Sequence, residues 1–100
     1  MLNLILAEEN ELVRIGLRTI FKNSDVQIIG EASNSRDLLS QIKSFKPDVV
    51  LIDYTGEGFT IDVIPKALTI SSDIRFVAIT PMQTGQTLVH ALKSGVRSYV

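Results

Sequence analysis

The sequence predicts an α/β domain, with a parallel sheet covered by helices on both faces. Short runs of Val, Ile and Leu alternate along the chain with segments whose apolar residues recur at helical spacing. The runs are apolar at successive positions, as expected for strands that are buried on both faces. With 100 residues, of which 45% are hydrophobic, the chain is large enough for a single core.

The first half of the chain predicts strands over residues 2–6, 26–30 and 49–52. A helix is expected over residues 11–22 with Asn10 as its N-cap, and a second helix begins after Asn34 or Ser35 and stops before Pro47. The expected inward faces are Val13, Leu17, Ile20 and Phe21 in the first helix and Leu38, Leu39, Ile42 and Phe45 in the second.

The second half predicts a third helix over about 61–68, a strand over 74–79, a fourth helix around Leu92 and a fifth strand over 96–100. Pro65 lacks a backbone donor, so the third helix should be short or kinked. Four helices on five strands should leave part of one sheet face bare. We therefore expect either a C-terminally truncated domain over residues 1–100, lacking its final helix, or a tight dimer.

Composition limits the possible partners. Ten basic and eleven acidic side chains give a formal net charge of -1, which offers no electrostatic footprint for nucleic acid or an anionic membrane. The chain has no cysteine, which excludes disulfides, thiolate nucleophiles and cysteine zinc sites. The N-terminal apolar run is too short for a signal peptide or membrane span. We expect a cytoplasmic protein.

Polar residues follow three of the apolar runs. Glu8 and Glu9 follow the first run, Asp53 follows the third, and Thr80 follows the fourth. Because ligand sites of parallel sheets lie outside the carboxyl ends of the strands, these side chains should converge. A carboxylate can attack a phosphoryl group, and oxygen ligands suit Mg²⁺. The pattern indicates Asp53 as a phosphoacceptor, the two glutamates as Mg²⁺ ligands and the Thr80 hydroxyl as a phosphoryl sensor.

These motifs, in this order, resemble the receiver (CheY-like) domain of two-component response regulators. The resemblance includes the acidic pair, the segment Pro-Asp-Val-Val-Leu-Ile-Asp over 47–53, Thr80, and Ala-Leu-Lys-Ser-Gly-Val-Arg-Ser-Tyr over 91–99. The segment 30–34 is similar to the NarL/FixJ (LuxR) branch, whose members usually carry a C-terminal helix-turn-helix output domain. The resemblance implies a flavodoxin-like doubly wound sheet with strand order 2-1-3-4-5.

The resemblance also implies residue roles. Asp53 would take phosphate from a sensor histidine kinase, and the backbone carbonyl of Thr55 would complete the Mg²⁺ site with Glu8, Glu9 and Asp53. Thr80 and Tyr99 would form a switch pair that alters dimerisation, with a homodimer as the expected assembly. DNA would be contacted only through an output domain that these 100 residues do not include. Such a domain promotes only its own phosphorylation and hydrolysis, so we do not expect an enzyme.

Two alternatives remain open. Glu9 stands where the family usually has Asp, and the loop over 54–59 departs from the family pattern. Both features favour a pseudo-receiver, in which the same fold serves as a dimerisation or docking module without phosphate chemistry. A small metal-dependent phosphatase would need an acid two residues after the nucleophile, where this chain has Thr55.

Overall fold

The computed structural model describes residues 2–53, 58–59, 62–78 and 98–99. Its parallel sheet has the order β2-β1-β3-β4-β5. The strands are β1 (Leu2–Ala7), β2 (Val26–Ala32), β3 (Val49–Ile52), β4 (Arg75–Ala78) and β5 (Ser98–Tyr99). The predicted flavodoxin-like α/β class and strand order are confirmed.

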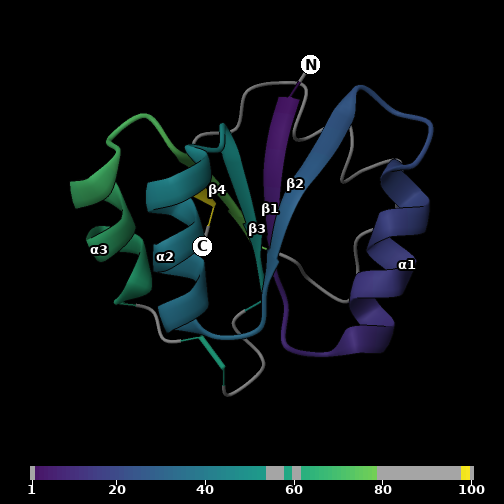
Figure 1. Ribbon diagram of the computed structural model, residues 1–100, viewed down its shortest axis with the longest axis horizontal. Helices are drawn as coiled ribbons and strands as arrows, with labels where there is room; N and C mark the ends of the chain where they lie inside the picture. The colour runs from purple at the N-terminus through teal and green to yellow at the C-terminus, as the bar shows by residue number, and fades with distance from the viewer. Residues whose placement is uncertain (1, 54–57, 60–61, 79–97, 100) are drawn as a thin grey trace.

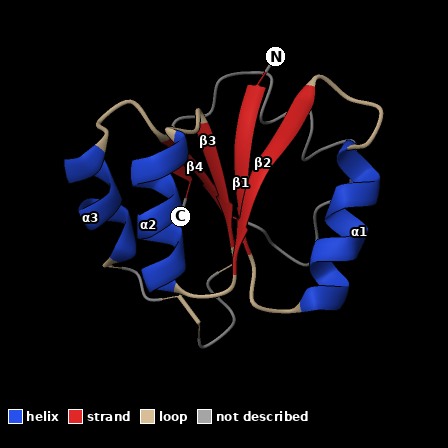
Figure 2. Ribbon diagram, viewed as in Figure 1, coloured by secondary structure: helices blue, strands red, loops and turns tan. Residues whose placement is uncertain are grey.

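In the described part of the chain, three helices lie on the two faces of this sheet. Helix α1 (Glu11–Phe21) covers one face, and α2 (Ser35–Phe45) and α3 (Val63–Ile70) lie side by side on the other (Figures 1 and 2). Since both faces are covered, the strands can be apolar at every position. Our fourth predicted helix lies outside the described residues.

Local chemistry explains where the helices begin. The side chains of Asn10 and Asn34 accept hydrogen bonds from the backbone N–H groups three residues later, at 3.1 and 2.8 Å. The predicted N-cap Asn10 is confirmed, and Asn34 is the N-cap among the two candidates for the second helix; each satisfies a first-turn donor that has no partner within its helix. Pro65 is the third residue of the eight-residue α3, where a missing N–H costs little, and the predicted short helix is confirmed.

The core has two parts because alternate strand residues point to opposite faces. The part under α2 and α3 includes Ile5, Ala7, Leu38, Ile42, Val50, Ile52, Ala67 and Phe76. The part under α1 includes Leu4, Leu6, Leu17, Phe21, Val49, Leu51 and Val77. We expected part of one sheet face to be bare. This expectation is wrong for β1, β3 and β4, whose central side chains are buried on both faces.

Three apolar side chains that we expected to face inward are exposed, namely Val13, Ile20 and Phe45. The contact of α1 with the sheet lies in its C-terminal half, where Leu17 and Phe21 are one turn apart, so Val13 and Ile20 lie beside that contact. Phe45 is the last residue of α2, and its ring lies near Gly30 on β2.

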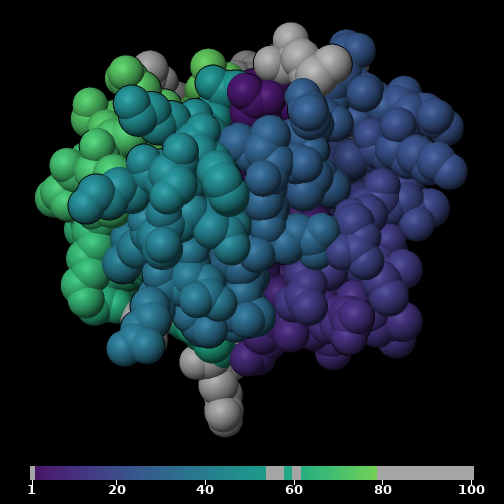
Figure 3. Space-filling view, viewed as in Figure 1, coloured from purple at the N-terminus to yellow at the C-terminus, as the bar shows by residue number. Residues whose placement is uncertain are grey.

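Strand β2 forms one edge of the sheet and reaches the surface between the helices. In the space-filling view, residues of β2 lie between the surfaces formed by α2 and α1 (Figure 3). The strand runs two residues beyond its predicted end and contains a register shift where it pairs with β1. Among the described helices, none is long and apolar enough to cross a lipid bilayer.

Candidate functional site

The carboxyl ends of β1 and β3 place two acidic residues at the same edge of the sheet. Ala7 and Ile52 are paired in register, and Glu8 and Asp53 follow them directly. The N–H of Asp53 donates to the carbonyl of Ala7 at 3.0 Å, and the N–H of Glu8 donates to the carbonyl of Ala32 at 3.0 Å. These backbone hydrogen bonds fix the positions of Glu8 and Asp53 independently of any contact between their side chains.

Glu8 is 2% exposed and is the only buried charged residue among those that the structure describes. Its Oε1 accepts a hydrogen bond from the N–H of Asn10 at 3.1 Å, whereas its Oε2 is buried without a donor. A buried carboxylate oxygen that lacks a donor is costly, and such groups in native proteins need an explanation.

The ionisation of Glu8 reflects this environment. Burial, followed by a side-chain hydrogen bond with Asp53 and the negative charges of Asp53 and Glu9, raises the pKa of Glu8 from 4.5 to about 7. The hydrogen bond from Asn10 acts against this rise in the pKa. Two carboxyl groups share a hydrogen bond only when one of them is protonated, so the contact with Asp53 favours the protonated form of Glu8.

Glu9 lies differently from the other two acids. Glu9 is exposed, and its side chain lies close to Gly58. A Cβ placed on Gly58 would lie 3.1 Å from Oε2 of Glu9 and 3.3 Å from Cβ of Glu9. Within the described part of the chain, no three His, Cys, Asp or Glu side chains form a group that could hold a metal ion. The structure therefore brings Glu8 and Asp53 together and places Glu9 against the backbone of Gly58.

Of the remaining three predicted site residues, the structure describes only Tyr99. Thr55 and Thr80 lie outside the described residues. Tyr99 lies in β5, where it pairs in register with Val77 of β4. This register places the backbone of Tyr99 beside the strand that leads toward Thr80. The predicted roles of these three residues stay predictions.

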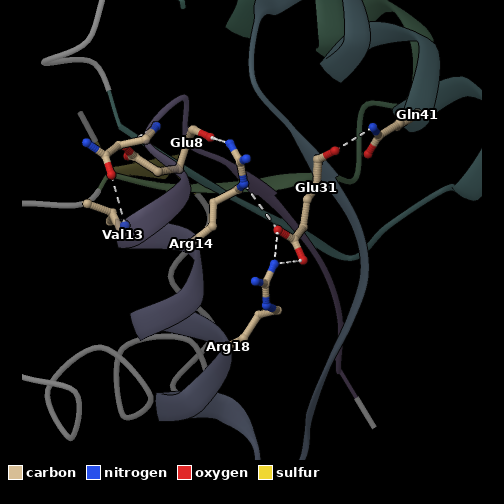
Figure 4. Close-up of polar contacts among 7 residues, drawn as sticks. Glu8, Val13, Arg14, Arg18, Glu31 and Gln41 are labelled. Atoms are coloured by element: carbon tan, nitrogen blue, oxygen red, sulfur yellow. Dashed lines mark hydrogen bonds and ion pairs between the residues drawn. The ribbon is translucent and has the colours of Figure 1, made fainter.

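A group of charged residues beside the site was missed by the sequence analysis. Arg14 of α1 donates through Nη1 to the backbone carbonyl of Glu8 at 2.6 Å, and its Nε lies 3.3 Å from Glu31 Oε1 (Figure 4). Arg18, one turn later, donates to both carboxylate oxygens of Glu31 at 2.6 and 2.7 Å. The spacing of the two arginines on one helical face was the available signal, since residues four apart are neighbours.

The residues present fit a Mg²⁺ ion. Mg²⁺ is usually held by one or two carboxylates together with several waters and a substrate phosphate, so it does not require a third protein carboxylate. Glu8 and Asp53 supply two adjacent carboxyl groups, and the buried Oε2 of Glu8 has no donor in the structure. A cation there would compensate both the missing donor and the repulsion between the two charges.

The fold and this pair of acids at the strand ends agree with the comparison to known families. The profile of the response regulator receiver domain matches residues 4–100. The chain belongs to this family. Among its relatives, YhcZ of Bacillus subtilis (strain 168), named an uncharacterized transcriptional regulatory protein, is 30% identical over 100 residues, covering 98% of this chain and 47% of YhcZ. This receiver domain thus spans about half the length of that relative.

Two further proteins agree with this assignment. The chemotaxis protein CheY of Thermotoga maritima is 25% identical over 97 residues, covering 96% of this chain and 81% of CheY. A DNA-binding response regulator of the LuxR family from Staphylococcus aureus has a similar fold, with a TM-score of 0.73, 24% identity, and coverage of 100% of this chain and 85% of that one. The predicted resemblance to the receiver domains of response regulators is confirmed.

Proposed function

We propose that this receiver domain acts in the cytoplasm and accepts a phosphoryl group on Asp53 from the phosphohistidine of a sensor histidine kinase. The contact between the Glu8 and Asp53 carboxyls supports this proposal, because it places a buried oxygen without a donor beside the acceptor. Two adjacent carboxylates facing an anionic phosphoryl group require a cation. Bound Mg²⁺ would supply the positive charge that offsets their repulsion.

The chain's own residues then have separate tasks. A carboxylate oxygen of Asp53 bonds to phosphorus as the phosphorus–nitrogen bond of the kinase histidine breaks, and that nitrogen keeps the electron pair. Glu8 and Asp53 would hold the cation, with the carbonyl of Thr55 as the further proposed ligand. The proposed signal is a shift in a conformational equilibrium through Thr80 and Tyr99, which changes homodimerisation or an attached output domain. The domain undergoes one phosphorylation per cycle and is not a turnover enzyme.

The test is the intact mass of the chain after incubation with Mg²⁺ and acetyl phosphate, a small phosphoryl donor. We expect one added phosphate in the wild type and none in Asp53→Asn. Asp48→Asn is the matched control, because Asp48 is an exposed acid at the opposite edge of the same sheet and should leave labelling unchanged. No added phosphate in the folded wild type, or labelling that persists in Asp53→Asn, would contradict the proposal.

One observation favours a second candidate function, the pseudo-receiver. Glu9 lies against Gly58, so only two of the three predicted carboxylates meet. A pseudo-receiver would use the fold as a constitutive dimerisation module. Sedimentation with Mg²⁺, with and without beryllofluoride as a phosphoryl mimic, separates the two functions. A dimer that is independent of the mimic favours the pseudo-receiver, and a mass that changes with it excludes a constitutive module.

A further inference from the structure

Arg14 connects the end of β1 to the edge strand β2. Its Nη1 donates to the carbonyl of Glu8 at 2.6 Å, and its Nε lies 3.3 Å from Glu31 Oε1. The side chain is 18% exposed, so both contacts are largely shielded from water. A planar guanidinium can hold two acceptors at once in a fixed relative orientation. Figure 4 shows the Arg14 guanidinium between Glu8 and Glu31.

Glu31 is itself held from both faces of the sheet. On one face, Arg18 of α1 binds both of its carboxylate oxygens, at 2.6 and 2.7 Å. On the other, Gln41 of α2 donates through Nε2 to its backbone carbonyl at 2.7 Å. Arg14 therefore contacts Glu31, whose side chain and backbone are both fixed. Because this contact already restricts the Arg14 side chain, binding the Glu8 carbonyl costs it little further conformational freedom.

The contact with Glu8 is to the backbone and not to the carboxyl group. The carbonyl of Glu8 is fixed by Arg14, and its Oε1 is fixed by the N–H of Asn10. With these two points held, the peptide that follows Glu8 cannot rotate without breaking a short hydrogen bond. The side chain is thereby kept against Asp53.

We propose that Arg14 is a positioning residue for the Mg²⁺ site, because it fixes the Glu8 backbone so that the Glu8 carboxyl stays beside Asp53. The inference rests on the proposed function. Residues that orient metal ligands from outside the coordination shell typically change metal affinity by about 10–100-fold when they are replaced. Arg14 acts through Glu8 and touches neither the ion nor the phosphoryl group.

The chain offers a matched control in Arg18. Arg14→Gln and Arg18→Gln each remove one positive charge from α1 and the ion pair of that arginine with Glu31, and glutamine is a good helix former. Only Arg14→Gln removes the donor to the Glu8 carbonyl. In Mg²⁺ titrations of the full chain followed by backbone amide shifts, we expect Kd to rise about 10-fold in Arg14→Gln. In Arg18→Gln, where only a half-exposed ion pair is lost, we expect a change below about 2-fold.

A second measurement needs no metal. The amide hydrogen of Asn10 is bonded to Glu8 Oε1, so its exchange with solvent reports how firmly the Glu8 side chain is held. We expect faster exchange in Arg14→Gln than in Arg18→Gln. If Arg14→Gln fails to fold, Arg14→Lys replaces it, since lysine keeps the charge but cannot contact both acceptors with a planar fork.

The outcomes separate the two proposals. A wild-type chain that shows no Mg²⁺-dependent shifts would contradict the proposed function, and the exchange of Asn10 would still decide whether Arg14 positions Glu8. Mg²⁺ binding by the wild type, with equal changes in the two glutamine variants, would overturn the inference about Arg14 alone. Unchanged exchange of Asn10 in Arg14→Gln would overturn it as well.

Discussion

Asp48 and Glu8 are acidic residues at opposite ends of the strands: Asp48 lies at the amino ends and Glu8 at the carboxyl ends. Their surroundings differ. Asp48 precedes β3 and is exposed; its Oδ2 accepts a hydrogen bond from the N–H of Asn3 at 2.9 Å. Its N–H donates to the carbonyl of Asn3 at 2.9 Å, and its carbonyl accepts from the N–H of Arg75 at 3.1 Å. Glu8 follows β1, is buried, and has a carboxylate oxygen without a donor.

The difference indicates what each acid contributes. The hydrogen bonds of Asp48 join the amino ends of three neighbouring strands, so its polar groups stabilise the fold directly. Glu8 opposes folding when it is ionised, because it is desolvated beside another carboxyl group. A site that destabilises the empty protein in this way is consistent with a bound cation, and functional sites commonly carry such a cost.

The largest expected effect comes from removing the charge of Glu8. The pKa of Glu8 is about 7 in the folded protein, against an ordinary value of 4.5, so the folded state binds this proton more tightly than the unfolded chain. The stability that the folded state gains by binding this proton is fully present below pH 4.5, and it is lost as the pH rises through about 7. The pKa difference corresponds to a penalty on the order of 3 kcal/mol above pH 8. Glu8→Gln should abolish this penalty in metal-free buffer.

Urea unfolding of wild type and Glu8→Gln at pH 5 and pH 8, with EDTA present, measures this effect. The free energies of unfolding of the two proteins should differ much less at pH 5 than at pH 8, where the variant should be the more stable. In a separate titration without EDTA, the variant should bind Mg²⁺ more weakly. Glu9→Gln is the matched control: Glu9 is exposed and has only a secondary influence on the pKa of Glu8. A stability difference that does not change with pH would contradict the assignment of the penalty to Glu8.

The fold and the pair of acids were predictable, because both depend on the chain's apolar pattern. Runs of apolar residues located the strands, and parallel strands end at a common edge, so Glu8 and Asp53 had to be neighbours. The placement of Glu9 against Gly58 was not predictable, since it depends on how the turn after β1 meets a distant loop. The Arg14 contact likewise depends on the rotation of α1 about its axis, which apolar spacing fixes only roughly.

Gly58, beside Glu9, and Gly16, in α1, differ in the space that each leaves for an added Cβ. A Cβ on Gly58 would lie 2.5 Å from the carbonyl oxygen of Ser33, and the N–H of Ser35 also donates to the Gly58 carbonyl at 3.0 Å. Gly58→Ala must therefore displace backbone, at a cost of about 1–3 kcal/mol. Gly16 in α1 has nothing within 4 Å of such a Cβ, and Gly16→Ala should gain about 0.5–1 kcal/mol.

Thermal unfolding of these two variants should therefore give opposite shifts in Tm, lower for Gly58→Ala and higher for Gly16→Ala. The pair is informative because each variant adds the same single methyl group. Equal shifts would mean that the loop at Gly58 can move away from Ser33 at little cost. In that case, the packing of Glu9 against this loop would not be fixed either.

The smallest expected effect tests the Asp48 side of the comparison. Asp48→Ala removes the acceptor of the Asn3 N–H but leaves both backbone hydrogen bonds of residue 48 in place. The bond is exposed, so water can replace the lost acceptor, and the expected loss is about 0.5–1 kcal/mol in the free energy of unfolding. Mg²⁺ affinity should not change, since the residue lies at the opposite edge of the sheet from Asp53. A weaker Mg²⁺ affinity in this variant would mean that the strands transmit strain from one edge to the other, and that the two acids are not independent.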